Sequence, residues 1–187
     1  MKIILSSASP RRRSILKDAG FDFEILAIDV DESFPPNLNS KQVPAFIASK
    51  KMDAARQSVA TKDNIIITAD TVVLLGDEII GKPINVEDAK HILRKLSGKM
   101  HKVITAVCIC KNGIETCMES ETNVYFDTMT DLEIENYITA FKPFDKAGAY
   151  AIQEWIGLNK ILRIEGDYYN VVGFPMSKVY PFLIENQ

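Results

Sequence analysis

Short apolar segments alternate with amphipathic ones along the chain. Apolar residues recur with a different period in each kind of segment, which distinguishes strands from helices. Phe23, Ile25 and Ala27 alternate with polar residues such as Glu24, which predicts a half-buried strand over 23–30. Ala89, Ile92 and Leu96 share one face of a helix that ends before Gly98. The same criteria predict strands at 2–6, 23–30, 64–75, 78–80, 101–110, 114–126, 149–152 and 160–164, and helices at 10–19, 44–59, 85–97, 130–140 and 175–184.

Turns and crossovers together define the expected fold class. Gly76-Asp77 and Asn112-Gly113 separate neighbouring strands as hairpin turns, whereas helices connect other strands. This combination predicts an α/β protein with a mixed β-sheet flanked by helices. No repeat, low-complexity tract or Pro/Gly-rich linker divides the sequence, so we expect a single domain over residues 1–187 whose core needs no disulfide or structural metal.

Composition narrows the classes of function. The chain has 22 Lys and Arg against 25 Asp and Glu, a net charge of −3, so we expect no stable nucleic-acid binding, which usually needs a strongly basic surface. The longest apolar stretch, residues 103–110, is far shorter than a membrane span, and residues 1–13 lack the apolar core of a secretory signal. We therefore expect a cytoplasmic protein that does not enter a membrane.

The three cysteines, Cys108, Cys110 and Cys117, lie close together in the sequence. None of them forms a C-x-x-C pair, and Cys108 and Cys110 are two residues apart, on one face of the expected strand. In a reducing compartment this pattern favours buried free thiols over a metal or redox site.

Residues 6–13 have the features of an anion-binding turn. A short strand leads through small residues into a helix that begins at Pro10, with Ser9 at the N-cap position. The N–H groups and dipole of a helix N-terminus attract anions, and Arg11 and Arg12 add guanidinium groups that match phosphate oxygens. The glycine pattern of a Walker loop is missing, and a solvated basic helix start is the alternative interpretation.

Asp70 interrupts an apolar, β-branched run at residues 64–75. Burying a carboxylate is costly unless the group is paired, protonated or bound to a metal. Acidic groups in such surroundings are candidates for general bases or metal ligands. The alternative is that the chain bends here and Asp70 caps a turn.

Other charged residues give weaker signals. Lys82 lies in a Gly-Lys-Pro turn that follows the expected hairpin. Asp31 and Glu32 follow the second expected strand, where carboxylate oxygens can hold a hard cation. Lys50 and Lys51 lie on the helix at 44–59, where only one of the two can face the same site.

Taken together, these segments resemble the Maf family of nucleoside triphosphate pyrophosphatases over nearly the entire chain. The resemblance implies a mixed-sheet α/β fold with a central cleft, similar to that of inosine triphosphatases. The segments that carry it are Ser7–Arg12, Asp31-Glu32, Lys50-Lys51, Ala69–Thr71, Gly81–Pro83, Leu96–His101, Asp145–Gln153 and Gly166–Pro175.

The resemblance also implies a reaction, in which a nucleoside triphosphate is hydrolysed between its α and β phosphates to the monophosphate and pyrophosphate. Asp70 would be the proton acceptor that activates water, and a divalent cation, Mg²⁺ or Mn²⁺, would be held by Glu32 and Asp70. The residues expected to hold the triphosphate are Ser9, Arg11, Arg12, Lys51 and Lys82. The choice of Lys51 over Lys50 depends on an alignment that a slip of one residue would reverse.

Base selectivity is implied by Arg12, Thr71 and Gln153, which match the family's base-selecting positions. Residues 149–153 resemble the branch that acts on dTTP and UTP. A glutamine amide complements the O4 acceptor and the N3–H donor of thymine or uracil. The departures from the family's usual residues, Ser6 and Phe174, concern packing near the site.

Two alternatives stay open. The chain could be a nucleotide-binding regulator of cell division, since Maf proteins are also associated with inhibition of septum formation. It could also be a pyrophosphatase that acts on another base, such as 7-methyl-GTP or a damaged pyrimidine. A house-cleaning role against non-standard nucleotides would accompany the main dTTP and UTP activity. The family alone suggests a homodimer.

Overall fold

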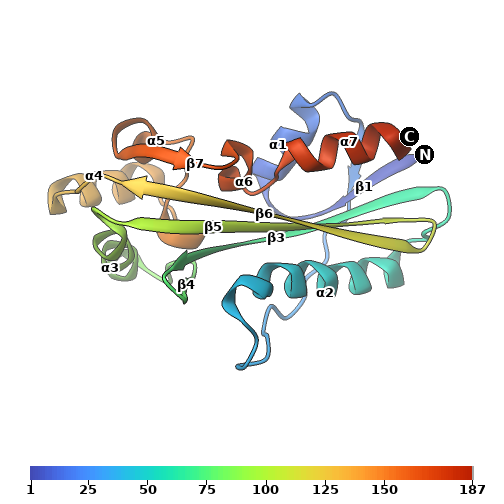
Figure 1. Cartoon of the computed structure of the whole chain (residues 1–187), viewed down its shortest axis with the longest axis horizontal. Coiled ribbons are helices and arrows are strands. Elements are labelled where there is room, and N and C mark those ends of the chain that lie inside the picture. Colours follow the sequence, from blue (N-terminus) through green and yellow to red (C-terminus); the bar gives the residue numbers. More distant parts are fainter. Residues whose placement is uncertain (187) are drawn as a thin grey trace. The chain divides into compact units, whose positions relative to one another are not determined.

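The computed structural model describes residues 1–186, which contain a seven-stranded mixed sheet (Figure 1). The strands follow the order β2-β1-β3-β5-β6-β7, and β4 pairs with β3. β1 is parallel to both β2 and β3, whereas β4 is antiparallel to β3, and β7 to β6. The predicted mixed sheet is therefore confirmed. The strands are β1 (Lys2–Ser6), β2 (Phe23–Ile25), β3 (Asn64–Leu75), β4 (Glu78–Ile80), β5 (Met100–Lys111), β6 (Ile114–Phe126) and β7 (Ile161–Glu165).

All the helices predicted from the sequence are present, together with short ones that were not predicted. Within residues 1–186, no helix is both long enough and apolar enough to cross a membrane. The α-helices are α1 (Pro10–Asp18), α2 (Val43–Ser58), α3 (Val86–Leu96), α4 (Asp131–Phe141), α5 (Trp155–Asn159), α6 (Tyr168–Val172) and α7 (Met176–Asn186), and the 3-10 helices are η1 (Ser40–Gln42) and η2 (Ala147–Ala149).

Two of the predicted strands are wrong in whole or in part. The strand expected at 23–30 ends at Ile25, because β1 is short and its last bond to this segment runs from the Leu26 N–H to the Leu5 carbonyl. The strand expected at 149–152 is absent. Ala149 has a positive φ of 58°, and the Glu154 N–H donates to the Ala151 carbonyl at 3.1 Å, which closes a turn. The segment therefore does not have the extended backbone of a strand.

Contacts divide the chain into two compact units. The first contains Met1–Thr71, Thr105–Ser120 and the chain from Gly173 onward, and the second contains Val72–Ile104 and Glu121–Val172. The long strands β3, β5 and β6 contribute residues to both units. A single domain over residues 1–187 and a central cleft stay predictions from the sequence.

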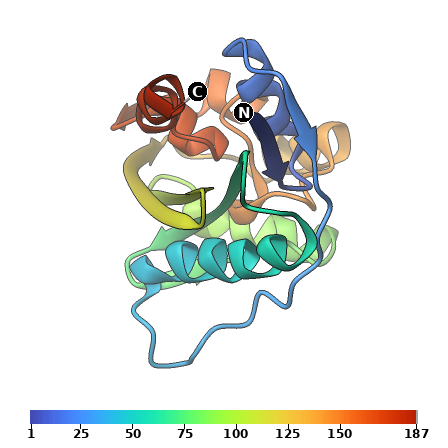
Figure 2. The ribbon, with the colours of Figure 1, turned by 90° about the vertical axis from the view of Figure 1, so that its right-hand side faces the viewer.

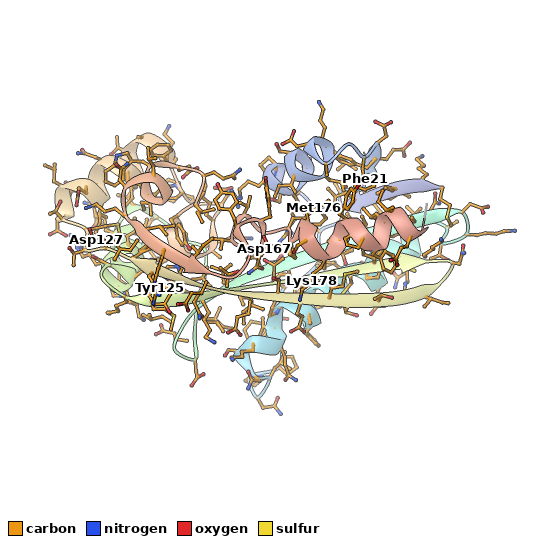
Figure 3. All side chains as sticks on the ribbon, turned by 45° about the horizontal axis from the view of Figure 1, so that its top comes forward. Phe21, Tyr125, Asp127, Asp167, Met176 and Lys178 are labelled. Atoms are coloured by element: carbon orange, nitrogen blue, oxygen red, sulfur yellow. A yellow bond between two sulfur atoms is a disulfide. The ribbon has the colours of Figure 1, made fainter. Side chains whose placement is uncertain are left out.

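In the first unit, helices cover both faces of the strands. α2 lies on one face, and α1 and α7 lie on the other (Figure 1 and Figure 2). The Thr68 hydroxyl donates to the Ala48 carbonyl at 2.7 Å, which fixes the register of β3 against α2. Since alternate strand residues share a face, Ile66 and Asp70 face α2 as Thr68 does. On the opposite face Phe21, labelled in Figure 3, makes an edge contact with Tyr180 of α7.

In the second unit, α3 packs against α4 and η2 around a continuous apolar core. His101 and Tyr150 are buried within it and share a 2.7 Å hydrogen bond. Burial lowers the pKa of His101 to about 3, so the imidazole is neutral at physiological pH. Asp167, labelled in Figure 3, accepts the Tyr169 N–H at 2.7 Å at the start of α6.

The prediction of free thiols is wrong for two of the three cysteines. Cys108 on β5 and Cys117 on β6 form a disulfide, whereas Cys110 is free and buried as expected. The two-residue turn Asn112-Gly113 sets the hairpin register and brings residues 108 and 117 opposite each other, with their Cα atoms 4.1 Å apart. The pairing depends on the register of two strands, which the pattern of either strand alone does not predict.

α4 begins with a capping box, as its sequence predicts. The Thr130 hydroxyl accepts the Glu133 N–H at 3.3 Å, and the Glu133 carboxylate accepts the Thr130 N–H at 2.8 Å. Lys160 also pairs with Glu133 at 2.7 Å. The hydrogen bond from Lys160, followed by the backbone bond from Thr130, lowers the pKa of Glu133 to about 2.

We expect Thr130→Ala to lower the free energy of unfolding by about 1 kcal/mol, because the hydroxyl satisfies an N–H group that is otherwise unpaired. Urea denaturation of the purified variant measures this change. Thr139→Ala in the same helix is the control, since the Thr139 hydroxyl only bonds back to the Glu135 carbonyl and alanine favours the helix. An equal loss in both variants would contradict a capping role.

Candidate active site

The turn between β1 and α1 lies beside the middle of β3. Parallel pairing places Ser6 opposite Thr68, so the residues after Ser6 reach β3 just beyond Thr68. The Ser7 hydroxyl accepts the Ser9 N–H at 3.3 Å. The Ser9 side chain makes no capping hydrogen bond to α1, and the first turn of α1 contains no acidic residue. This helix N-terminus keeps the positive character that the sequence predicts for an anion site.

Arg12 connects the turn to β3 and to the segment before α7. The alternative from the sequence was a basic helix start exposed to solvent. It is wrong for Arg12, because four of the five N–H groups of this side chain bond to the protein. Nε donates to the Gly173 carbonyl (2.9 Å), Nη1 to the Ser7 hydroxyl (3.3 Å) and the Ala69 carbonyl (2.8 Å), and Nη2 to the Thr71 hydroxyl (3.0 Å).

Thr71 and Gly173 form the surroundings of the Arg12 guanidinium. The Thr71 hydroxyl also bonds to the Thr105 hydroxyl at 2.9 Å. Gly173 has a φ of +109°, and a Cβ at this position would lie 3.3 Å from Thr71 Oγ1. Glycine therefore allows both the backbone conformation and the close approach. Neither Gly173 nor Thr105 was predicted from the sequence as a site residue, although Gly173 belongs to a segment that carries the family resemblance.

Asp70 is a buried strand residue. β3 runs without interruption from Asn64 to Leu75, so the alternative in which Asp70 caps a turn is wrong. Its Oδ1 accepts a hydrogen bond from Lys51 Nζ at 2.8 Å. Burial raises the pKa of Asp70, and the charge and hydrogen bond of Lys51 are the main opposing influences, followed by the charge of Arg12.

Lys51, rather than Lys50, contacts Asp70. Lys51 lies one helical turn after Ala48, so it faces β3 two residues beyond Thr68. Its ammonium also lies 2.7 Å from Glu32 Oε1. Lys50 points elsewhere and pairs with Asp31 at 3.4 Å.

Glu32 and Asp70 converge on one point, since each places a carboxylate oxygen within hydrogen-bonding distance of the same Lys51 nitrogen. Such oxygen ligands suit a hard divalent cation. Mg²⁺ in particular is usually bound by one or two carboxylates, with water and substrate phosphates completing its coordination. The donor set therefore fits the cation expected from the sequence.

β3 separates the predicted residues of this unit into two groups. Neighbouring strand residues point to opposite faces, so Asp70 meets Lys51 of α2, whereas Thr71 meets Arg12 of α1. Arg12 therefore influences the Asp70 carboxylate through its charge and not through a hydrogen bond.

Lys82 and Gln153 belong to the second unit, where both are exposed. The Gly81 carbonyl accepts the Gly148 N–H at 3.1 Å, which joins the Lys82 turn to η2. Gln153 lies in the turn closed by the Glu154 N–H on the Ala151 carbonyl. The contacts of Lys82 and Gln153 with a nucleotide stay predictions.

The turn that carries Gln153 is held by residues that the sequence analysis missed. The Tyr137 hydroxyl accepts the Ala151 N–H at 3.2 Å and donates to the Glu154 carboxylate, so it binds both ends of the turn. Buried Lys146 lies 3.4 Å from the same carboxylate. Lys146 belongs to the segment 145–153 that carries the resemblance, and Glu154 directly follows it. A lysine in an apolar stretch was the one signal in the sequence that could have pointed to this group.

Comparisons with known proteins match almost the whole chain. The family model described as "Maf-like protein" matches residues 2–186. Proteins named dTTP/UTP pyrophosphatase are similar in three organisms: Phocaeicola vulgatus (43% identity, 96% of this chain and 93% of that protein), Cytophaga hutchinsonii (44%, 95% and 80%) and Parabacteroides distasonis (44%, 96% and 93%).

A solved nucleoside-triphosphatase, the dITP/XTP pyrophosphatase of Mycobacterium abscessus, matches 69% of this chain and 76% of its own. Its TM-score of 0.38 and identity of 10% are too low to support a conclusion about fold or activity. The match of the family model over residues 2–186 and the identity to the three relatives lead to one conclusion: the chain belongs to the Maf-like protein family.

Proposed function

We propose that the chain is a nucleoside triphosphate pyrophosphatase that hydrolyses dTTP and UTP to the monophosphate and pyrophosphate. The observation that carries the proposal is Asp70, a buried carboxylate in mid-strand that shares the Lys51 ammonium with Glu32. A purely structural role would not need an ionised group at this cost. The names of the three relatives agree with this reaction.

Asp70 acts in this proposal as the general base. It accepts a proton from the attacking water, and the phosphorus–oxygen bond between the α and β phosphates breaks, releasing pyrophosphate. Burial raises its pKa and makes the carboxylate a better proton acceptor, while the charge and hydrogen bond of Lys51 oppose that rise. A divalent cation held by Glu32 and Asp70 would neutralise phosphate charge.

The triphosphate is assigned to the N-terminus of α1 and to four cations predicted from the sequence. Ser9 and Arg11 lie in the first residues of that region, where the helix dipole favours anions. Arg12 has one N–H group left for a ligand, so its main contribution is to hold Thr71 and the turn in place. Lys51 and Lys82 complete the proposed set.

Base selection is assigned to Gln153 together with Arg12 and Thr71. The Gln153 amide is exposed at the tip of a turn that Tyr137 and Glu154 hold from behind. An amide offers both a donor and an acceptor, which match the O4 and N3–H groups of thymine and uracil.

We expect Asp70→Asn to lower kcat for dTTP and UTP by at least about 100-fold, because removal of a general base costs 10²- to 10⁴-fold. Pyrophosphate release with Mg²⁺ or Mn²⁺ measures the rate, and circular dichroism checks the fold. Asp31→Asn is the control, since Asp31 is exposed and bonds to Ser33 and Lys50.

Full turnover in folded Asp70→Asn would disprove the general-base assignment. If the wild-type chain bound triphosphates but released no pyrophosphate with any divalent cation, the nucleotide-binding regulator would be favoured instead.

We expect Lys51→Met to shift the acidic limb of the pH profile of kcat/KM to higher pH. Asp70 accepts a proton only when ionised, so activity falls as pH drops through its raised pKa. Removing Lys51 removes the main opposing influence and raises that pKa further. Lys50→Met is the control and should leave the limb in place. A lower rate with an unshifted limb would mean that Lys51 does not act on Asp70.

We expect Gln153→Ala to lower kcat/KM for dTTP and UTP by roughly 5- to 150-fold, which corresponds to two hydrogen bonds of about 0.5–1.5 kcal/mol each. The kcat/KM for purine triphosphates, measured at equal concentration, should fall less. The preference of the enzyme for pyrimidine nucleotides should therefore become smaller. Asn159→Ala, which removes another exposed amide of the same unit, is the control. An equal loss for all bases would exclude base recognition by Gln153.

A further inference from the structure

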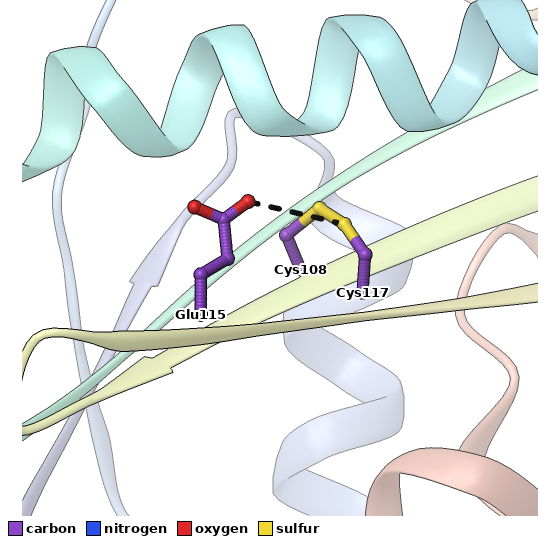
Figure 4. Close-up of side chains that lie close together, drawn as sticks. All are labelled: Cys108, Glu115 and Cys117. Atoms are coloured by element: carbon purple, nitrogen blue, oxygen red, sulfur yellow. Dashed lines mark hydrogen bonds between the residues drawn. A yellow bond between two sulfur atoms is a disulfide. The ribbon is translucent and has the colours of Figure 1, made fainter.

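A second group of side chains with metal-binding chemistry lies on the β5–β6 hairpin, within the first unit. Cys108, Glu115 and Cys117 converge beneath α2 (Figure 4), and their ligand atoms all lie within 4.8 Å of one another. Cys108 is buried and Cys117 is exposed. In the structure the two sulfur atoms form a disulfide, so only the reduced chain offers them as ligands.

The Glu115 carboxylate is oriented as a ligand would be. Its Oε1 lies 4.0 Å from Cys117 Sγ and accepts the Ser49 hydroxyl at 3.0 Å. Its Oε2 lies 2.8 Å from Arg56 Nη2. Partners of this kind fix the orientation of metal-binding carboxylates, and the second lone pair of Oε1 remains for the metal.

The charge and the donor types favour a thiophilic divalent cation. Two thiolates select Zn²⁺ over Mg²⁺ or Ca²⁺, which prefer oxygen ligands. Two thiolates and one carboxylate around Zn²⁺ carry a net charge of −1, and the adjacent Arg56 balances that charge. The exposure of Cys117 gives the ion a path of entry and leaves room for a water as fourth ligand.

We propose that the reduced chain binds one Zn²⁺ ion through Cys108, Cys117 and Glu115, and that the disulfide is the oxidised, metal-free state of the same site. Reduction takes two electrons and two protons from an external dithiol, which itself becomes a disulfide. Binding then forms two Zn–S bonds and one Zn–O bond and releases the two thiol protons. This inference does not depend on the proposed pyrophosphatase activity.

Titration with Co²⁺, a spectroscopic substitute for Zn²⁺, tests the proposal. The chain is first reduced with dithiothreitol, which is then removed without oxygen. We expect a thiolate-to-cobalt charge-transfer band in the near ultraviolet that saturates at one equivalent and disappears when Zn²⁺ displaces the cobalt. Glu32 and Asp70 offer only oxygen ligands and cannot produce this band.

Variants identify the ligands. Cys117→Ser should abolish the band and weaken Zn²⁺ binding by at least about 100-fold, since loss of outer partners alone costs 10- to 100-fold. Glu115→Gln should weaken binding and keep the band. Cys110→Ala is the matched control, because Cys110 is free, buried and on the same strand as Cys108, and it should bind as the wild type does. Circular dichroism verifies each fold.

Either of two results would overturn the proposal: a reduced wild type without the charge-transfer band, or folded Cys117→Ser with the band unchanged. Oxidised wild type, in which the disulfide blocks both sulfur atoms, should give no band and serves as a second control.

Discussion

The carboxyl group of Asp70 lies inside a strand that is buried on both faces, and Lys51 is the main influence that favours its charged form. Removing a charge from water costs several kcal/mol, so the pair survives only while its geometry is maintained. That geometry comes from apolar packing: the Thr68–Ala48 bond fixes α2 against β3 and thereby places Lys51 over Asp70. The candidate active site thus depends on the packing of one helix against one strand.

Much of this arrangement could be predicted from local patterns. The β-branched run at 64–75 predicted β3, and the Ser-Pro start predicted α1, because both signals depend on neighbouring residues only. Asp70 was identified because a carboxylate in an apolar run needs a partner. The family resemblance supplied the assignment to Lys51 over Lys50, which the 2.8 Å contact supports.

The features that were missed all depend on contacts between different elements of the chain. Arg12 was expected to bind phosphate, and its bond to Gly173, 161 residues away, could not be inferred from its neighbours. The Cys108–Cys117 pairing requires the register of two strands, and the strand expected at 149–152 was displaced by a turn that Tyr137 of α4 holds. Periodicity describes which side chains are buried and does not describe what they touch.

The Tyr137 hydroxyl bonds to both ends of the 151–154 turn, so the shape of that turn does not depend on the side-chain amide of Gln153 at its tip. Side-chain identity at position 153 and loop geometry are therefore separable traits. If Gln153 selects the base as proposed, single exchanges at the tip would change the base preference without rebuilding the turn behind it. Under the same proposal, changes to Tyr137 or Glu154 would lower discrimination among all nucleobases at once.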